Sequence, residues 1–288
     1  MTDKKTIKNR IRRVLLTGLL VFAIFCVLVL AFQDAMIFLH VPYSESFEFL
    51  RDRPGFIKIE FEAENGRTFH GVKFQAYDEL SPLLIYFGGN GEVSYRHMHM
   101  REHFGQWTYF TGFNYLFIDY VGYGRNDGRT SYRAIYEGAL AVFDFAVTLP
   151  NIDSERIVTM GFSLGTAAAV YLAAHRPVAG LILASPFASG YDLFNNVLPI
   201  FHGPMRLLVR QRFPSYRHAP QVDCPALIIA SRRDEIVPFS SSERLAGLFP
   251  GDVYFMELEG LRHNDIFGAL GVHDRIRQFL EDIFCSKG

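Results

Sequence analysis

A serine between two glycines stands out among the residues that could do chemistry. Residues 161–165 read G-F-S-L-G, and they join a β-rich run at 156–161 to a run of small residues typical of a helix at 164–175. At such a strand–turn–helix junction a serine hydroxyl projects from the carboxyl edge of a sheet, and the glycines let strand and helix pack closely. The motif alone is common, but this context predicts that Ser163 is a nucleophile.

A serine hydroxyl is a poor nucleophile unless a base takes its proton and an acid orients that base. Asp234 and His263 each follow a buried β-rich run, in that order after Ser163. Both therefore fall in loops at the carboxyl ends of strands, at the edge of the sheet that carries the serine. We predict Asp234 as the acid and His263 as the base. The neighbouring Glu235 is the alternative acid, and His273, near the start of the last helix, is the alternative base.

Acyl transfer from such a serine also needs two N–H donors for the developing oxyanion. The backbone N–H of Leu164, directly after the nucleophile, would be one of them. We predict Asn90 as the other, because the Gly-rich stretch 88–91 follows a buried β-rich run and can turn its backbone inward. The same stretch has neither the G-K-[ST] nor the G-x-G-x-x-G pattern of nucleotide-binding loops, so no nucleotide cofactor is expected.

Metal-ligating residues give no comparable pattern. His99 and His103 are four residues apart on a predicted helix, but no further ligands converge on them, and a solvent-exposed helix face explains them better than a metal site. The three cysteines, at positions 26, 224 and 285, are far apart and odd in number, which is typical of small buried residues rather than of disulfides. We expect neither a metal nor another cofactor.

The elements that must position these groups alternate along the chain from residue 57. The β-rich runs lie at 57–62, 68–74, 82–87, 114–120, 156–161, 180–184, 226–231 and 253–258. Helical patterns lie at 132–149, 164–175 and 274–283. A turn at Asn65 and Gly66 predicts that the first two runs form an antiparallel pair. The alternation that follows predicts a mostly parallel sheet flanked by helices on both faces.

The N-terminal residues have a different composition. Residues 14–32 carry no charge, which as a helix spans about 28 Å, and six of the 29 Lys and Arg residues precede them. A cleaved signal peptide would need a shorter apolar run, and Phe25 stands before Cys26 where a lipid-modified cysteine requires a small residue. We predict a transmembrane anchor whose basic flank stays in the cytoplasm, with the following domain on the opposite side of the membrane.

The chain therefore divides into a basic flank at 1–13, the anchor at 14–32, a connector at 33–56 and a catalytic domain at 57–288 with a cap insertion at 186–221. Residues 33–288 hold 23 basic and 29 acidic residues, a net charge of −6, which argues against nucleic acid as a partner. The insertion is rich in Phe, Leu and Val and would suit a hydrophobic group. Its cations, Arg206, Arg210 and Arg212, either meet an anionic group or face solvent.

Five motifs occur together in the order of a known family. They are YFGGN at 86–90, DYVGYG at 119–124 with Asp127 and Gly128, GFSLG at 161–165, DEIVP at 234–238, and Gly260 with His263 and Asn264. Over about residues 57–285 the chain thus resembles the α/β-hydrolases related to the yeast bud-emergence protein and to the ABHD-type lipid and thioester hydrolases. Many of these also have one N-terminal membrane span. The resemblance implies an α/β-hydrolase fold with a Ser163–His263–Asp234 triad, an oxyanion hole at Asn90 and Leu164, and Asp119 as a structural residue.

From these observations we expect a membrane-anchored serine hydrolase that acts through an acyl-enzyme on esters or thioesters of acyl or lipid-like compounds. A peptidase or amidase is the alternative, because the triad does not specify the leaving atom. A membrane-tethered binding protein without activity is a third interpretation, and the intact set of catalytic groups argues against it. No obligate protein partner is evident.

Overall fold

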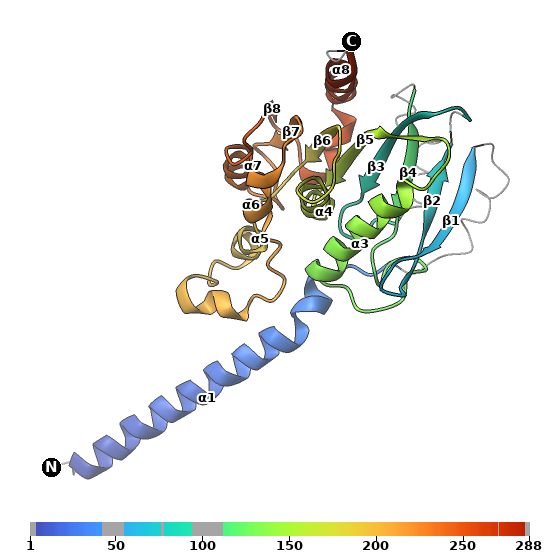
Figure 1. Ribbon diagram of the computed structural model, residues 1–288. Coiled ribbons are helices and arrows are strands. Elements are labelled where there is room, and N and C mark those ends of the chain that lie inside the picture. Colours follow the sequence, from blue (N-terminus) through green and yellow to red (C-terminus); the bar gives the residue numbers. More distant parts are fainter. Residues whose placement is uncertain (1–3, 42–54, 76–77, 94–111, 270, 286–288) are drawn as a thin grey trace.

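The central sheet has eight strands in the order β1-β2-β4-β3-β5-β6-β7-β8 (Figure 1). The computed structural model describes residues 4–41, 55–75, 78–93, 112–269 and 271–285. β2 pairs antiparallel with both β1 and β4, and all the other neighbours run parallel. The strands are β1 (Phe56–Glu62), β2 (Thr68–Phe74), β3 (Ser81–Phe87), β4 (Asn114–Ile118), β5 (Ile152–Phe162), β6 (Gly180–Ala184), β7 (Ala226–Ser231) and β8 (Val253–Leu258).

The burial of each strand follows from its place in this sheet. The inner strands β3, β4, β6 and β7 are buried at every position, as parallel strands covered on both faces must be. The edge strand β1 instead exposes Lys58, Glu60 and Glu62 and buries Ile59. The expected turn between β1 and β2 is present, with Gly66 at a φ of 75°. The predicted mostly parallel sheet with an antiparallel first pair is confirmed.

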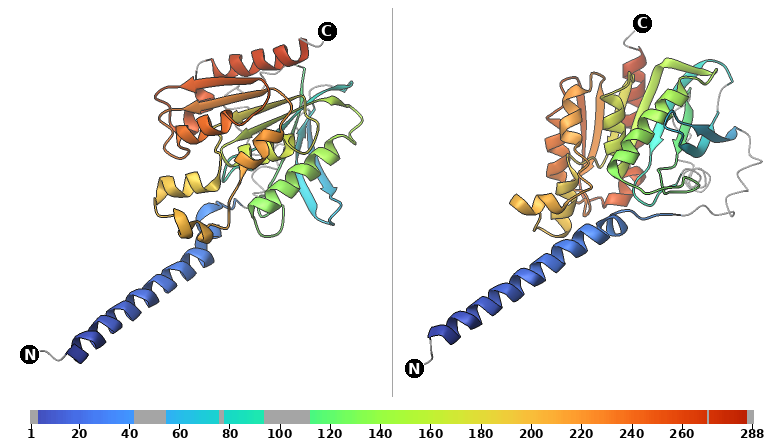
Figure 2. Two further views of the ribbon diagram at one scale, coloured as in Figure 1. Left: turned by 60° about the vertical axis from the view of Figure 1, so that its left-hand side comes forward. Right: turned by 60° about the horizontal axis from the view of Figure 1, so that its bottom comes forward.

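Helices cover both faces of the sheet (Figure 2). α3 (Tyr132–Ala146) and α4 (Leu164–Ala173) pack together on one face, and α8 (Val272–Cys285) packs over β6 and β7 on the other. The hydroxyl of Ser131 accepts the backbone N–H of Ala134 and caps the start of α3. The helices that the sequence predicts after β4, after β5 and at the C-terminal end are all present, each with slightly different bounds.

α7 (Phe239–Ala246) is a helix that the sequence pattern did not reveal. Its sequence, FSSSERLA, has serines where an apolar stripe would be expected. Two of these serines are buried because their hydroxyls bond to main-chain atoms: Ser241 accepts the N–H of Ala188, and Ser242 donates to the carbonyl of Pro186. Tertiary hydrogen bonds therefore replace the hydrophobic signal.

The N-terminal helix, α1 (Lys4–Ile37), projects away from the domain (Figures 1 and 2). By length and composition it could cross a membrane, and its most apolar 18-residue window is not buried. The helix contains the predicted span 14–32 and continues to Ile37, so the start of the expected connector is helical. Gln33 and Phe38 are buried, and residues 42–54 of the connector lie outside the described residues.

The close approach of α4 to the sheet depends on the two glycines of the serine motif. A Cβ on Gly165 would lie 2.0 Å from the carbonyl oxygen of Phe87 in β3, and one on Gly161 would lie 2.5 Å from the carbonyl oxygen of Gly165. No side chain fits at such distances. The glycines therefore set how deeply the helix start sits against the sheet.

We expect Gly165→Ala to lower the free energy of unfolding by about 3 kcal/mol, because the backbone of β3 must move to admit the methyl group. Gly247→Ala is the matched control, since a Cβ there meets nothing closer than 3.8 Å and the residue has an ordinary φ of −69°. Chemical denaturation of the detergent-solubilised protein, followed by circular dichroism, measures both. Equal stability of the two variants would contradict the packing argument.

Candidate active site

Ser163 occupies a sharp turn between β5 and α4. Its φ of 49° and ψ of −115° lie in a region that residues other than glycine rarely adopt. The turn is held on both sides: the backbone N–H of Ser163 donates to the carbonyl of Ala184 at 2.9 Å, and the hydroxyl of Thr166 donates to the carbonyl of Ser163 at 2.6 Å. The strand–turn–helix geometry expected around this serine is thus present.

Asp234 and His263 form a buried pair. Nδ1 of His263 and Oδ2 of Asp234 are 2.7 Å apart, and only 4% and 2% of the two side chains are exposed. Burial by itself raises the pKa of Asp234, but hydrogen bonds and the His263 charge outweigh it and hold the pKa below its usual value. Because the carboxylate accepts at Nδ1, the other imidazole nitrogen, Nε2, remains for proton transfer.

The imidazole lies against the residue that precedes Ser163. Its ring stacks on Phe162, the residue before Ser163, with 5.0 Å between the ring centroids. Ser163 is itself largely buried, with 8% exposure. Within the described part of the chain no hydrogen bond joins the Ser163 hydroxyl to His263, and such contacts commonly tighten only when substrate binds. The structure thus brings the three predicted residues to one end of the sheet.

The alternative acid and base have other partners. Glu235 accepts the backbone N–H of His263 at 3.1 Å and pairs with Arg262 at 3.3 Å, so it holds the histidine loop rather than the imidazole. His273 lies in the first turn of α8, where its Nε2 contacts the carbonyl oxygen of Phe267 at 2.7 Å. The Glu235 side chain thus contacts the main chain of His263, whereas Asp234 contacts its imidazole.

The two predicted oxyanion donors come from neighbouring elements. Leu164 is the first residue of α4, and Asn90 lies in the loop that follows β3. This loop abuts the helix start, because the carbonyl oxygens of Phe87 and Gly88 crowd the Cα of Gly165. Among the described residues no acceptor takes the backbone N–H of Leu164 or Asn90. Both donors are therefore available to a developing oxyanion.

The side chain of Asn90 has a role that the sequence did not suggest. Its Oδ1 accepts from the hydroxyl of Tyr123 at 2.7 Å and from the N–H of Leu39 at 3.0 Å, and its Nδ2 donates to the carbonyl of Ile37 at 2.5 Å. Two of these bonds fix the loop after β3 to the end of α1, and the third ties it to Tyr123, which follows β4. The N-terminal helix is structurally part of this site.

Ser185 is a second residue that sequence reasoning missed. It directly follows β6, is buried, and has a φ of 49°. Its hydroxyl donates to Oδ2 of Asp234 at 2.7 Å, the same oxygen that contacts His263. The signal that could have revealed it is its position at the carboxyl end of β6. In the sheet β6 lies between β5, which leads to Ser163, and β7, which leads to Asp234.

We expect Ser185→Ala to lower kcat about 10-fold with little change in KM, since a hydrogen bond to a charged group contributes about 1.5–3 kcal/mol and this one orients the acid. The matched control is Thr159→Val, which removes a buried hydroxyl of β5 that has no hydrogen-bond partner among the described residues. Steady-state kinetics and thermal unfolding would be measured together. An unchanged kcat in Ser185→Ala would remove this residue from the acid's support.

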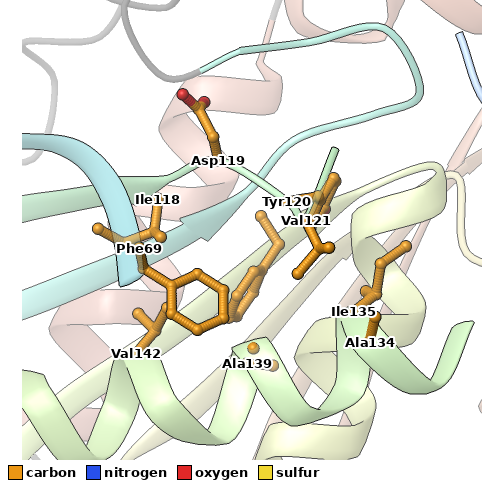
Figure 3. A pocket seen from close by; sticks show the side chains of 11 residues that line it. Phe69, Ile118, Asp119, Tyr120, Val121, Ala134, Ile135, Ala139 and Val142 are labelled. Atoms are coloured by element: carbon orange, nitrogen blue, oxygen red, sulfur yellow. The ribbon is translucent and has the colours of Figure 1, made fainter. Parts of the chain in front are cut away.

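The remaining candidates do not add to the site. Asp119 is buried at the end of β4, with its carboxylate against Gly124, which fits the implied structural role. It borders a cavity between the sheet and α3 that is otherwise lined by apolar side chains such as Phe69 and Val142 (Figure 3). At about 10 Å³ this cavity has room for one water at most. His99 and His103 lie outside the described residues, and within those residues no group of three His, Cys, Asp or Glu could hold a metal.

Comparison with known proteins shows similarity to α/β-hydrolases. Residues 83–217 match a family model described as "Serine aminopeptidase, S33". An uncharacterized protein of Mycobacterium tuberculosis is 34% identical over 228 residues, which are 78% of this chain and 79% of the relative. An α/β hydrolase domain-containing protein of Caenorhabditis elegans is 31% identical over 168 residues, 58% of this chain and 49% of that protein.

Solved structures share the fold at lower identity. An esterase of Pyrococcus furiosus superimposes with a TM-score of 0.64 at 17% identity, covering 85% of this chain and 98% of that one. An acetyl xylan esterase of Paenibacillus sp. R4 gives a TM-score of 0.62 at 16% identity, covering 80% and 86%. The chain belongs to the α/β-hydrolase superfamily and is ABHD-like within it, as the motifs implied. By family it is a hydrolase.

Proposed function

We propose that this protein is a serine hydrolase that acts through an acyl-enzyme. The observation that carries the proposal is the arrangement of Asp234, His263 and Ser163: a buried carboxylate bonds to one nitrogen of an imidazole that stacks on the residue before the serine. Neither the rival acid nor the rival base makes a comparable contact. The strained turn at Ser163 and the two available backbone N–H groups support the same chemistry.

The proposed reaction has two halves. Nε2 of His263 takes the proton of the Ser163 hydroxyl while Oγ of Ser163 attacks the substrate's carbonyl carbon. The backbone N–H groups of Leu164 and Asn90 stabilise the oxyanion that forms. Asp234 stabilises the imidazolium, which then protonates the leaving group. In the second half His263 activates water, which attacks the acyl-serine, releases the acid and restores Ser163.

For the substrate class we propose carboxylic esters or thioesters with a hydrophobic acyl group. The cap insertion, residues 186–221, carries large apolar side chains such as Phe187, Phe194 and Phe201, and α1 gives the protein a membrane-compatible segment. A peptidase acting through the same residues is the second candidate, favoured by the description of the matched family model as a serine aminopeptidase.

We also propose that α1 is a membrane anchor, with its basic flank in the cytoplasm and the catalytic domain on the opposite side. A core helix of a soluble protein would be covered, whereas the apolar window of α1 is not. Protease added to intact cells should digest the domain in this orientation. A domain that resists protease until the cells are opened would place it in the cytoplasm instead.

A fluorophosphonate probe tests the nucleophile. It should label the wild-type protein, fail to label Ser163→Ala, and label His263→Ala only weakly, because the proton acceptor is lost. Ser185→Ala and Glu235→Gln should both remain labelled, which distinguishes loss of the nucleophile from general damage to the site. A folded wild-type protein that resists the probe would refute the proposal.

A matched panel of acyl esters, acyl thioesters and aminoacyl amides separates the two candidate substrate classes. We expect the first two groups to be hydrolysed and kcat/KM to rise with acyl length, since each buried CH₂ adds about 0.8 kcal/mol of binding. Equal turnover of short and long chains would argue against a hydrophobic acyl site. Faster turnover of the amides would favour the peptidase.

A further inference from the structure

The tip of the cap exposes apolar side chains to an unusual degree. Of the large apolar residues that the structure describes outside α1, the two most exposed are Val197 at 85% and Leu207 at 75%. Both belong to the segment 197–208, VLPIFHGPMRLL. This segment contains one cation, Arg206, and no acidic residue. Clustered exposed apolar side chains of this kind mark interaction surfaces.

This tip belongs to a structure that is held in place. It runs from the last residue of α5 (Gly190–Val197) through the 3₁₀ helix η3 (Gly203–Leu208), which begins two residues after Phe201. Asn195 exchanges two hydrogen bonds with the main chain of Phe201. Asp192 of α5 accepts from Ser241 of α7 at 2.7 Å. The exposed apolar residues are therefore presented by an ordered element.

The cap is also bonded to the end of α1. The side chain of Gln33 donates to the carbonyl of Leu208 at 3.0 Å and accepts the N–H of Arg210 at 2.8 Å. Asp34 accepts from Arg210 at 3.0 Å and from Gln211 at 2.8 Å. These contacts begin immediately after Phe32, the last residue of the uncharged run 14–32. They place the cap at the level where the apolar span ends.

The contact with α1 extends along its axis. η3 packs against α1, and Figure 2 shows the cap beside the upper part of this helix. On α1 the partly covered side chains form one stripe at helical spacing: Phe25, Cys26, Val29 and Leu30, followed by the buried Gln33. At 1.5 Å per residue this stripe extends about 12 Å along α1 from Gln33 toward the N-terminus. The cap tip therefore lies alongside residues of the apolar run.

We propose that the cap tip, residues 197–208, inserts its apolar side chains into the bilayer that α1 spans. The proposal rests on the membrane anchor proposed above, because an anchor that spans the bilayer carries whatever is fixed at Gln33 to its surface. Arg206 fits this position: its guanidinium lies 4.9 Å from the centroid of the Tyr191 ring, where its stem can follow apolar surface while the charge reaches headgroups. The exposed apolar side chains of the cap tip would thus contact lipid.

The arrangement has a consequence for substrate access. Asn196, next to the exposed Val197, donates to the carbonyls of Glu235 and Ile236 in the loop that carries the acid Asp234. One end of α5 therefore contacts the catalytic loop while the adjoining residues lie in lipid. A hydrophobic acyl group in the bilayer would then lie next to the element that contacts the loop of Asp234.

The experiment uses the full chain in nanodiscs that hold one copy each and contain lipids brominated on their acyl chains, which quench nearby tryptophan. Leu207→Trp tests the cap tip, and Val197→Trp tests it independently. Leu20→Trp, in the middle of α1, reports the anchor alone, and Phe255→Trp, on the edge strand β8, is the control for an exposed position away from α1. The wild-type protein gives the background of its single tryptophan.

We expect Leu207→Trp and Val197→Trp to lose emission as Leu20→Trp does, and Phe255→Trp to keep it. If Leu20→Trp is quenched while both cap variants behave like Phe255→Trp, the anchor stands and the cap proposal is overturned, and the tip then faces water or a protein. If Leu20→Trp also keeps its emission, the anchor is wrong and the cap proposal falls with it. None of these readouts requires catalysis, so a failed serine mechanism leaves them unaffected.

Discussion

A carboxylate removed from water must regain its hydrogen bonds from the protein, and Asp234 does so from three successive parts of the sheet. Its oxygens accept from Ser185 at the end of β6, from the N–H groups of Ile236 and Val237 in its own loop, and from His263 after β8. An unpaired buried charge would cost several kcal/mol. The ends of β6, β7 and β8 must therefore keep a fixed relation to one another, and that relation places the imidazole beside Phe162.

The serine side of the site is fixed by packing instead. Gly161 and Gly165 let α4 start against β3. The same close approach brings the loop after β3 next to the sharp turn at Ser163. That loop is then bonded through Asn90 to the last residues of α1. Because Gln33, four residues before Ile37, bonds to the cap, one short stretch of chain contacts both the loop after β3 and the cap. The end of the N-terminal helix is thus built into the α/β-hydrolase domain.

Much of this arrangement could be predicted because its signals are local. The sharp turn at Ser163, the strands and the turn at Gly66 each depend on residues close in sequence. The order of Ser163, Asp234 and His263 along the chain follows from the motifs. Ser185 could not be assigned, because its partner lies 49 residues away and only the sheet order shows that their strands are neighbours. The hydrogen bonds of the Asn90 side chain could not be predicted for the same reason, because its partners are 53 and 33 residues away in sequence.

The closed state of the site raises the question of which contacts yield when substrate enters. Ser163 and His263 are largely buried, so a substrate reaches them only where neighbouring contacts are released. The cap is held by Asn196 and by ion pairs such as Asp192 with Arg244 and Asp34 with Arg210, whose arginines are exposed. Water reaches the arginines of these pairs, so separating them costs less than releasing one partner of the fully buried Asp234–His263 pair, which costs about 3–5 kcal/mol. A displacement of the cap would therefore leave Asp234 and His263 in place and keep the low-dielectric surroundings that strengthen their interaction.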